Sequence, residues 1–144
     1  MGRLLGIDYG ERRIGLAISD ITGTIATPLE VVPGNDPPQA AKQIVGIAEA
    51  REVSRIIIGL PMRMDGSHGP AAEKAKAFAD LIRKHTVIPI QFWDERFSTL
   101  TAEQALIEGG ARRDKRKQVV DKLAAQIILQ HYLDAQPGEP FATP

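Results

Sequence analysis

The sequence contains no cysteine among its 144 residues. A disulfide-stapled scaffold, a zinc site with thiolate ligands and a cysteine nucleophile are therefore all excluded. Net charge is missing as well, because 18 Lys and Arg residues balance 18 Asp and Glu residues. The protein thus has no uniformly basic field, and any contact with nucleic acid would need a local basic patch.

Long apolar runs are also absent. No stretch approaches the roughly 20 apolar residues needed to cross a bilayer, and the first apolar run meets Asp8 too early to be a signal-peptide core. We therefore expect a cytoplasmic protein. The composition, 43% hydrophobic and 25% charged, is typical of soluble globular proteins. The length suits one domain, expected over 1–135, with a loose proline-containing tail at 136–144.

Hydrophobic patterning predicts five strands. The apolar runs at Leu4–Tyr9 and Ile14–Asp20 are joined by a short polar link, which is typical of a β-hairpin. A third strand is expected at 25–32, in an edge position because it contains Pro28. Two later apolar runs are typical of strands covered on both faces, and they lie at 55–61 and 87–93.

Helices are expected between and after the later strands. Asp36 is a typical N-cap, followed by two prolines that suit the first turn of a helix, and Pro70 opens a second helix. Further helices are expected at 101–110 and 119–134, with polar loops at 62–69 and 111–118. This order predicts an α/β fold, in which a three-strand antiparallel meander plus two parallel strands form a mixed five-stranded sheet flanked by helices.

Three carboxylates stand out by their positions. Asp8 lies inside an apolar strand, where an unpaired charge is costly, Glu95 follows another buried strand, and Asp121 lies at the expected start of the last helix. Each also has a simpler explanation: a turn cap, a solvated strand end, and an acid that favours a helix N-terminus. Asp94 is a weaker candidate than Glu95, because neighbouring strand residues point to opposite faces.

Together the three carboxylates indicate a metal site. Ligands of open α/β sheets bind outside the carboxyl ends of the strands, and three carboxylates there can hold two magnesium ions about 3.5–4 Å apart. Hard oxygen ligands suit Mg²⁺ or Mn²⁺. Such a site hydrolyses phosphodiester bonds with water as the attacking group. Asp8, Glu95 and Asp121 are therefore the candidate catalytic and metal-binding residues.

A basic run directly before Asp121 is the candidate substrate contact. It could grip a phosphate backbone, although charge runs are usually solvated loops. Arg63, in the polar loop at 62–69, could also reach a phosphate, with a plain connecting loop as the alternative. The candidates in the basic run are Arg112, Arg113, Lys115, Arg116 and Lys117.

Four blocks of the sequence resemble the YqgF/RuvX family. The first block, 6–20, contains the segments GIDYG and RIGLA, and the others lie at 59–69, 94–99 and 121–125. They occur in the family's order, they cover almost the whole chain, and all three acidic positions are kept. The resemblance implies a ribonuclease-H-like fold, with Asp8, Glu95 and Asp121 as the metal-binding catalytic residues.

The resemblance also implies what the protein acts on. The family is described as Holliday-junction resolvases and as nucleases that mature the 5′ end of pre-16S rRNA, and we adopt the second description. Pre-rRNA and the pre-ribosomal particle are then the expected partners, and the chain could be a monomer or a homodimer. The residues expected to support the substrate are Arg12, Arg13 and Arg96.

Three other functions stay open. Branched DNA could be the substrate of the same site, and a homodimer would favour it, because a two-fold junction needs two paired sites. A phosphotransferase of the actin and sugar-kinase type has a similar opening hairpin, but it needs two lobes where this chain has room for one. A non-catalytic RNA-binding protein would need only the basic run, yet carboxylates near phosphate weaken binding unless metals neutralise them.

Overall fold

The computed structural model describes residues 2–63, 65–94 and 113–136, with side chains left out of the description for 113–120. Five strands and three helices are present in these ranges. The strands are β1 (Arg3–Asp8), β2 (Arg13–Ser19), β3 (Ala26–Pro33), β4 (Val53–Leu60) and β5 (Ile90–Asp94). The helices are α1 (Pro37–Ala50), α2 (Pro70–Arg83) and α4 (Arg113–Ala135).

The strands form one mixed sheet in the order β3-β2-β1-β4-β5. β1 pairs antiparallel with β2, and β2 with β3, whereas β4 lies parallel to both β1 and β5. β3 is an edge strand, and the register of its pairing shifts between Leu16 and Ala17, opposite the segment that contains Pro28. The predicted fold class is therefore confirmed, including the edge position that Pro28 indicated.

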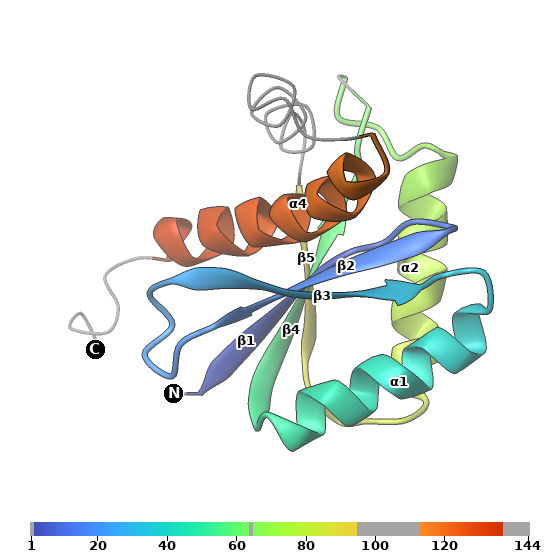
Figure 1. Cartoon of the computed structure of the whole chain (residues 1–144). Helices are drawn as coiled ribbons and strands as arrows, with labels where there is room; N and C mark the ends of the chain where they lie inside the picture. The colour runs from blue at the N-terminus through green and yellow to red at the C-terminus, as the bar shows by residue number, and fades with distance from the viewer. Residues whose placement is uncertain (1, 64, 95–112, 137–144) are drawn as a thin grey trace.

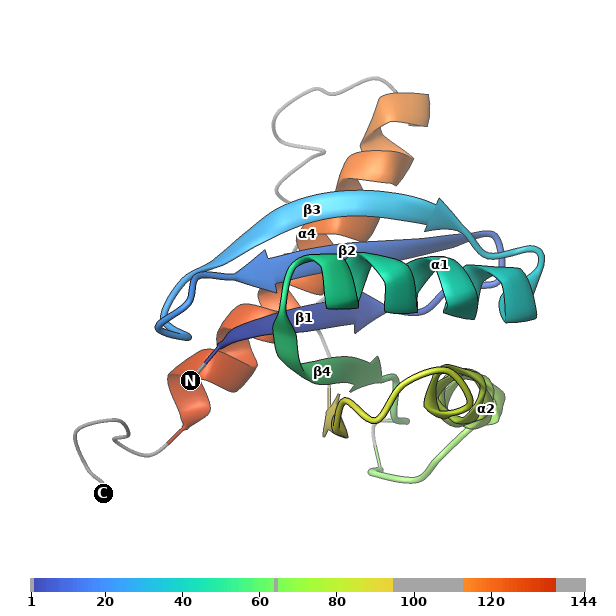
Figure 2. The same ribbon diagram turned by 90° about the horizontal axis from the view of Figure 1, so that it is seen from below.

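The sheet is covered on both faces, which creates two apolar layers. Figures 1 and 2 show α1 and α2 on one face and α4 lying across the other. The α1 and α2 layer is the larger, and fully buried Ile7, Leu16 and Ile58 contribute to it. The α4 layer contains Ala17 and Ile57 of the sheet, packed against Ala125, Ile128 and Leu129 of the helix. No helix in the described ranges is long and apolar enough to cross a membrane.

Two sequence predictions need correction, and a third is not tested. β5 begins at Ile90, three residues later than expected, and Val87 is 99% exposed, because Pro89 brings no backbone N–H to a ladder. The segment 113–118, expected as a loop, belongs to α4, since Arg, Lys and Gln are good helix formers even without an apolar stripe. The expected helix at 101–110 lies outside the described residues.

The buried face of α4 also differs from the predicted one. Ala124 and Ile128 are buried as expected, but Leu123 and Ile127 are only half-buried. Ala125, Leu129 and Tyr132 complete the contact with the sheet. Asp121 precedes Ala125 by one helical turn, so it lies on the same face as this apolar seam.

Two glutamines fix the position of α4 along the sheet. The backbone N–H of Ala26 donates to Gln130 Oε1 at 2.9 Å, and the Gln126 amide donates to the Ala26 carbonyl at 3.0 Å. The Gln130 amide also donates to the carbonyl of Thr24 at 2.9 Å. These bonds satisfy backbone groups on the outer edge of β3, which would otherwise need water or another strand.

We expect Gln130→Leu to lower the unfolding free energy by about 1–3 kcal/mol. The substitution leaves the N–H of Ala26 without its acceptor, and Ala26 is only 1% exposed. Gln43→Leu, at an exposed position of α1, is the matched control and should change stability by less than about 0.5 kcal/mol. Urea unfolding of both variants measures the difference. Equal stabilities would show that the glutamine does not anchor α4.

Candidate active site

Asp8 is the last residue of β1 and faces α4. It pairs with Gly15 of β2, and both residues lie on the side of the sheet that α4 covers. Burial raises the pKa of the Asp8 carboxyl to about 7, and the nearby negative charge of Asp121 adds to the rise. A turn cap would be solvated or hydrogen-bonded in its charged form, so the simpler explanation of Asp8 does not fit this environment.

A close approach between β2 and α4 brings Asp121 to Asp8. A Cβ atom at Gly15 would overlap the backbone carbonyl of Asp121, so only glycine allows the helix to lie this near the strand. Gly6 makes the same allowance further along α4, where an added Cβ would lie 2.8 Å from the Cβ of Leu129. Asp8 and Gly15 are register partners. The carboxylate of Asp8 and the backbone of Asp121 therefore flank the same point of the sheet.

Asp121 lies within α4 and not at its start. The helix begins at Arg113 and Asp121 follows eight residues later, beyond the first turn in which a helix dipole favours an acid. The prediction that this residue opens the last helix is therefore wrong, and the explanation as a helix N-terminal acid is removed with it. The cause is the longer helix, which includes the basic run.

Arg13 is the charged partner of Asp121. Its Nε donates to Asp121 Oδ2 at 2.6 Å, with the two side chains 34% and 19% exposed respectively. Burial raises the pKa of Asp121, and the hydrogen bond and positive charge of Arg13 oppose that rise. Arg13 thus holds the Asp121 carboxylate in place, and within the described part of the chain it forms no hydrogen bond or ion pair with Asp8.

The donor set fits a hard divalent cation. Two neighbouring half-buried carboxylates offer oxygen ligands, and desolvation together with the charge of Asp121 raises the pKa of Asp8 to about 7. No group of three or more acidic or histidine residues gathers within the described ranges, which do not contain Glu95. Trp93 packs in the α4 layer, so strand alternation directs Asp94 to the opposite face of the sheet.

The expected substrate residues fall into three groups. Arg12 lies in the link between β1 and β2, and Arg13 begins β2 and bonds to Asp121. Arg63 lies in a small hairpin closed by the Met62–His68 bridge, with its guanidinium against Gly69 at the start of α2. The remaining candidates cannot be placed as side chains: Arg113, Lys115, Arg116 and Lys117 are in the first turns of α4, and Arg96 and Arg112 lie outside the described residues.

Residues 2–135 match the model of the RuvX family, which is described as Holliday junction resolvase. The chain belongs to the RuvX family. A protein of Halothermothrix orenii is 49% identical over 134 residues, which is 93% of this chain and 96% of that protein. A protein of Pelotomaculum thermopropionicum is 44% identical over 139 residues, 96% and 90% of the two chains. Both are named "Putative pre-16S rRNA nuclease".

Solved structures show the fold of this RuvX protein. RuvC of T. thermophilus in complex with a Holliday junction substrate has a TM-score of 0.60 at 16% identity, covering 94% of this chain and 95% of that chain. The Fowlpox virus resolvase in complex with Holliday junction DNA has a TM-score of 0.56 at 12% identity, covering 94% and 99%. The ribonuclease-H-like fold, the family and the enzyme class, a hydrolytic nuclease, are thus confirmed.

The sequence did not reveal what positions the RuvX carboxylates. Gly15 is part of the RIGLA segment, but its role depends on a helix more than a hundred residues away. The one available signal was the pair Ala124–Ala125, three and four residues after Asp121, because small residues on a helix allow close packing against small residues of a sheet.

We expect Gly15→Ala to displace α4 and to lower the unfolding free energy by about 1–3 kcal/mol or more, because the added methyl group overlaps the Asp121 backbone. Gly46→Ala is the matched control. A Cβ there meets nothing within 4 Å, and alanine in helix α1 should stabilise the protein by about 0.5–1 kcal/mol. Chemical unfolding separates the two signs. Stabilisation by both substitutions would contradict the close approach.

We expect Asp8→Asn to stabilise the metal-free protein at pH 8. Folded Asp8 holds its proton up to about pH 7, whereas the unfolded residue loses it near 3.8. The folded state therefore binds more protons between these values, and stability falls as pH rises through this window. The asparagine stays neutral, so its advantage over aspartate should grow between pH 4 and pH 8 by up to about 4 kcal/mol.

Unfolding in EDTA at both pH values measures this growth. Asp80→Asn is the control, because the Asp80 side chain is 73% exposed. It should show no comparable growth between pH 4 and pH 8. A constant difference between wild type and Asp8→Asn would contradict the buried environment of Asp8.

Proposed function

We propose that this protein is a divalent-metal-dependent endonuclease that processes the 5′ end of pre-16S rRNA. In this proposal Asp8, Glu95 and Asp121 are the metal-binding and catalytic carboxylates. Mg²⁺ or Mn²⁺ is the cofactor, bound as two ions. Glu95 enters on its place in the sequence, directly after Asp94 at the end of β5.

The observation that carries the proposal is the half-buried pair of Asp8 and Asp121. An ionised carboxylate that is partly desolvated beside another one costs stability in the metal-free chain. A protein that only bound RNA would gain nothing from such a pair, and the negative charge would repel phosphate. A divalent cation removes both disadvantages, which favours a metal-dependent enzyme over the non-catalytic alternative.

The chain's own residues prepare the site in two ways. Asp8 and Asp121 present oxygen ligands from two rigid elements, a central strand and the helix packed on it. Arg13 orients the Asp121 carboxylate through its 2.6 Å bond. Bound Mg²⁺ or Mn²⁺ would supply the chemistry that these groups lack, by lowering the pKa of water and by stabilising charge on the leaving oxygen.

The names of the relatives support RNA as the substrate. Proteins that are 41–49% identical over more than nine-tenths of this chain are named pre-16S rRNA nucleases, with the qualification quoted above. A four-way DNA junction is the second candidate. It is supported by the description of the family model and by the fold shared with RuvC.

The test is cleavage of two labelled substrates in Mg²⁺: a 16S rRNA precursor with its 5′ leader, and a synthetic four-way DNA junction. We expect the wild-type protein to cut the RNA. Asp121→Asn should reduce the cleavage rate by more than roughly 100-fold, the upper range for residues that only support a metal ligand. Asp80→Asn, with the same change of charge at an exposed site of α2, should cut like wild type. EDTA should abolish cleavage.

Other outcomes would change the proposal in defined ways. Symmetric cleavage of the junction alone would replace RNA by branched DNA as the substrate. RNA cleavage that survives Asp121→Asn and EDTA would overturn the role of the carboxylates. If neither substrate is cut by wild type, while the same precursor within a pre-ribosomal particle is cut, the particle is a required partner.

A further inference from the structure

A pocket with a volume of about 380 Å³ opens between the edge of the sheet and α4. Its lining comes from two consecutive strands and a helix that is distant in the sequence: Arg12 and Arg13 before and in β2, Val31 and Pro33 of β3, and Lys122 of α4. The five described lining residues include three cations and no acid. Lys122 directly follows Asp121, so the pocket adjoins the candidate active site.

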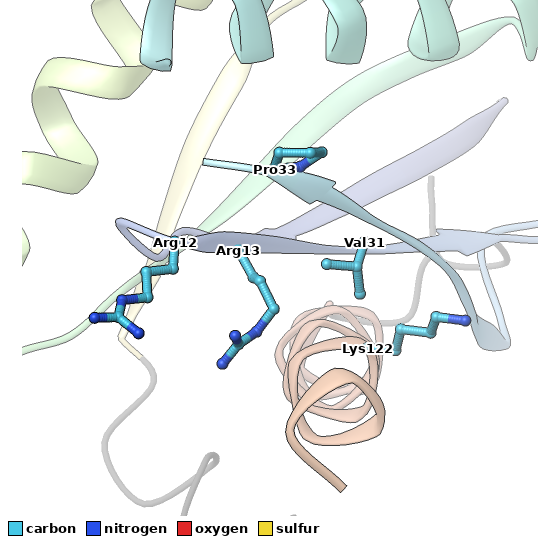
Figure 3. Close-up of a pocket in the computed structure, with 5 residues that line it drawn as sticks. All are labelled: Arg12, Arg13, Val31, Pro33 and Lys122. Atoms are coloured by element: carbon cyan, nitrogen blue, oxygen red, sulfur yellow. The ribbon is translucent and has the colours of Figure 1, made fainter. Parts of the chain in front are cut away.

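The cations flank the pocket and do not converge on one point. Figure 3 shows Arg13 and Val31 pointing toward α4, with Arg12 beyond Arg13 and Lys122 on the other side of Val31. A single small anion would favour converging donors, as in a bidentate clamp. Positive charges on two sides of a groove with an apolar wall suit an extended polyanion instead, whose sugars contact Val31 and Pro33.

The charge of the pocket is only partly neutralised. Arg13 donates its Nε to Asp121, which leaves the terminal nitrogens of its guanidinium for another acceptor. Arg12 is exposed and Lys122 is half-buried, and neither forms an ion pair with another described residue. Glu30, the neighbour of Val31, pairs with Leu16 and by strand alternation faces the opposite layer.

We propose that this pocket binds the backbone of the substrate strand next to the cleaved phosphodiester, with Lys122 contacting one phosphate and Arg12 and Arg13 another. The inference rests on the proposed nuclease function for the position of the cleaved bond. It adds Lys122 as a substrate-binding residue. It also places the bound nucleic-acid strand between β3 and α4. The experiment below also shows whether the pocket binds only inorganic phosphate.

The test is metal-free binding of a labelled single-stranded oligoribonucleotide in EDTA, followed by fluorescence anisotropy at several salt concentrations. Lys122→Gln should weaken binding several-fold and make the slope of log affinity against log salt shallower by about 0.7, the value for one phosphate of a single strand. Lys122→Arg should restore most of the affinity. Lys42→Gln, an exposed position on α1 across the sheet, should bind like wild type.

The outcomes separate this inference from the proposed function. Unchanged affinity and slope in Lys122→Gln, in a protein that cuts RNA, would overturn the pocket and leave the nuclease standing. Lys122-dependent binding in a protein that cuts nothing would support the pocket and overturn the nuclease. If millimolar inorganic phosphate displaced the labelled strand as well as an unlabelled oligoribonucleotide does, the extended-strand occupant would be overturned. Absence of RNA binding in EDTA would overturn the pocket alone, because the nuclease is tested separately by cleavage in Mg²⁺.

Discussion

The close contact between α4 and β2 is the constraint on which the candidate site depends. A helix normally packs on a sheet with side chains between them, which would keep its backbone away from the strands. Here Gly15 has no side chain, which leaves room for the backbone carbonyl of Asp121. Gly6 likewise leaves room for Leu129. The apolar seam through Ala125, Ile128 and Tyr132 holds the helix in that position. The hydrogen bonds between the side-chain amides of Gln126 and Gln130 and the backbone of Ala26 fix the position of the helix along the sheet.

This arrangement has an energetic consequence that links stability to function. The same packing that excludes water from the sheet also buries Asp8 beside Asp121, and it raises the pKa of both carboxyls. Arg13 compensates for one of the two charges and leaves the other to an additional cation. Functional sites commonly retain such locally unfavourable groups, because the ligand that relieves them is the one that the protein has to bind.

The sequence predicted the sheet well because its signals are local. Alternating apolar runs defined the hairpin, Pro28 marked the edge strand, and Asp36 accepts the N–H of Gln39 at the start of α1 as an N-cap should. Asp8 was recognisable as a charge within an apolar strand. The beginning of α4 was missed because a run of basic residues has no apolar period, although its members favour helices.

The rest could not be read locally, because it depends on contacts between distant segments. Gly15 faces Asp121, Arg13 bonds to it, and Lys122 shares a pocket with β3, and these contacts exist only after the helix has packed on the sheet. Family resemblance supplied the acidic trio, but not the reason why two of its members meet. That reason is steric: Gly15, which belongs to the RIGLA segment, has no side chain to keep the backbone of Asp121 away from β2.

Whether Asp8 and Asp121 form a divalent cation site can be measured by following Mn²⁺ binding with electron paramagnetic resonance. We expect wild-type protein to bind Mn²⁺ near neutral pH, and we expect Asp8→Asn and Asp121→Asn each to weaken binding by roughly tenfold or more. Asp80→Asn, at an exposed position, should bind like wild type. Equal Mn²⁺ affinity in all four proteins would contradict the claim.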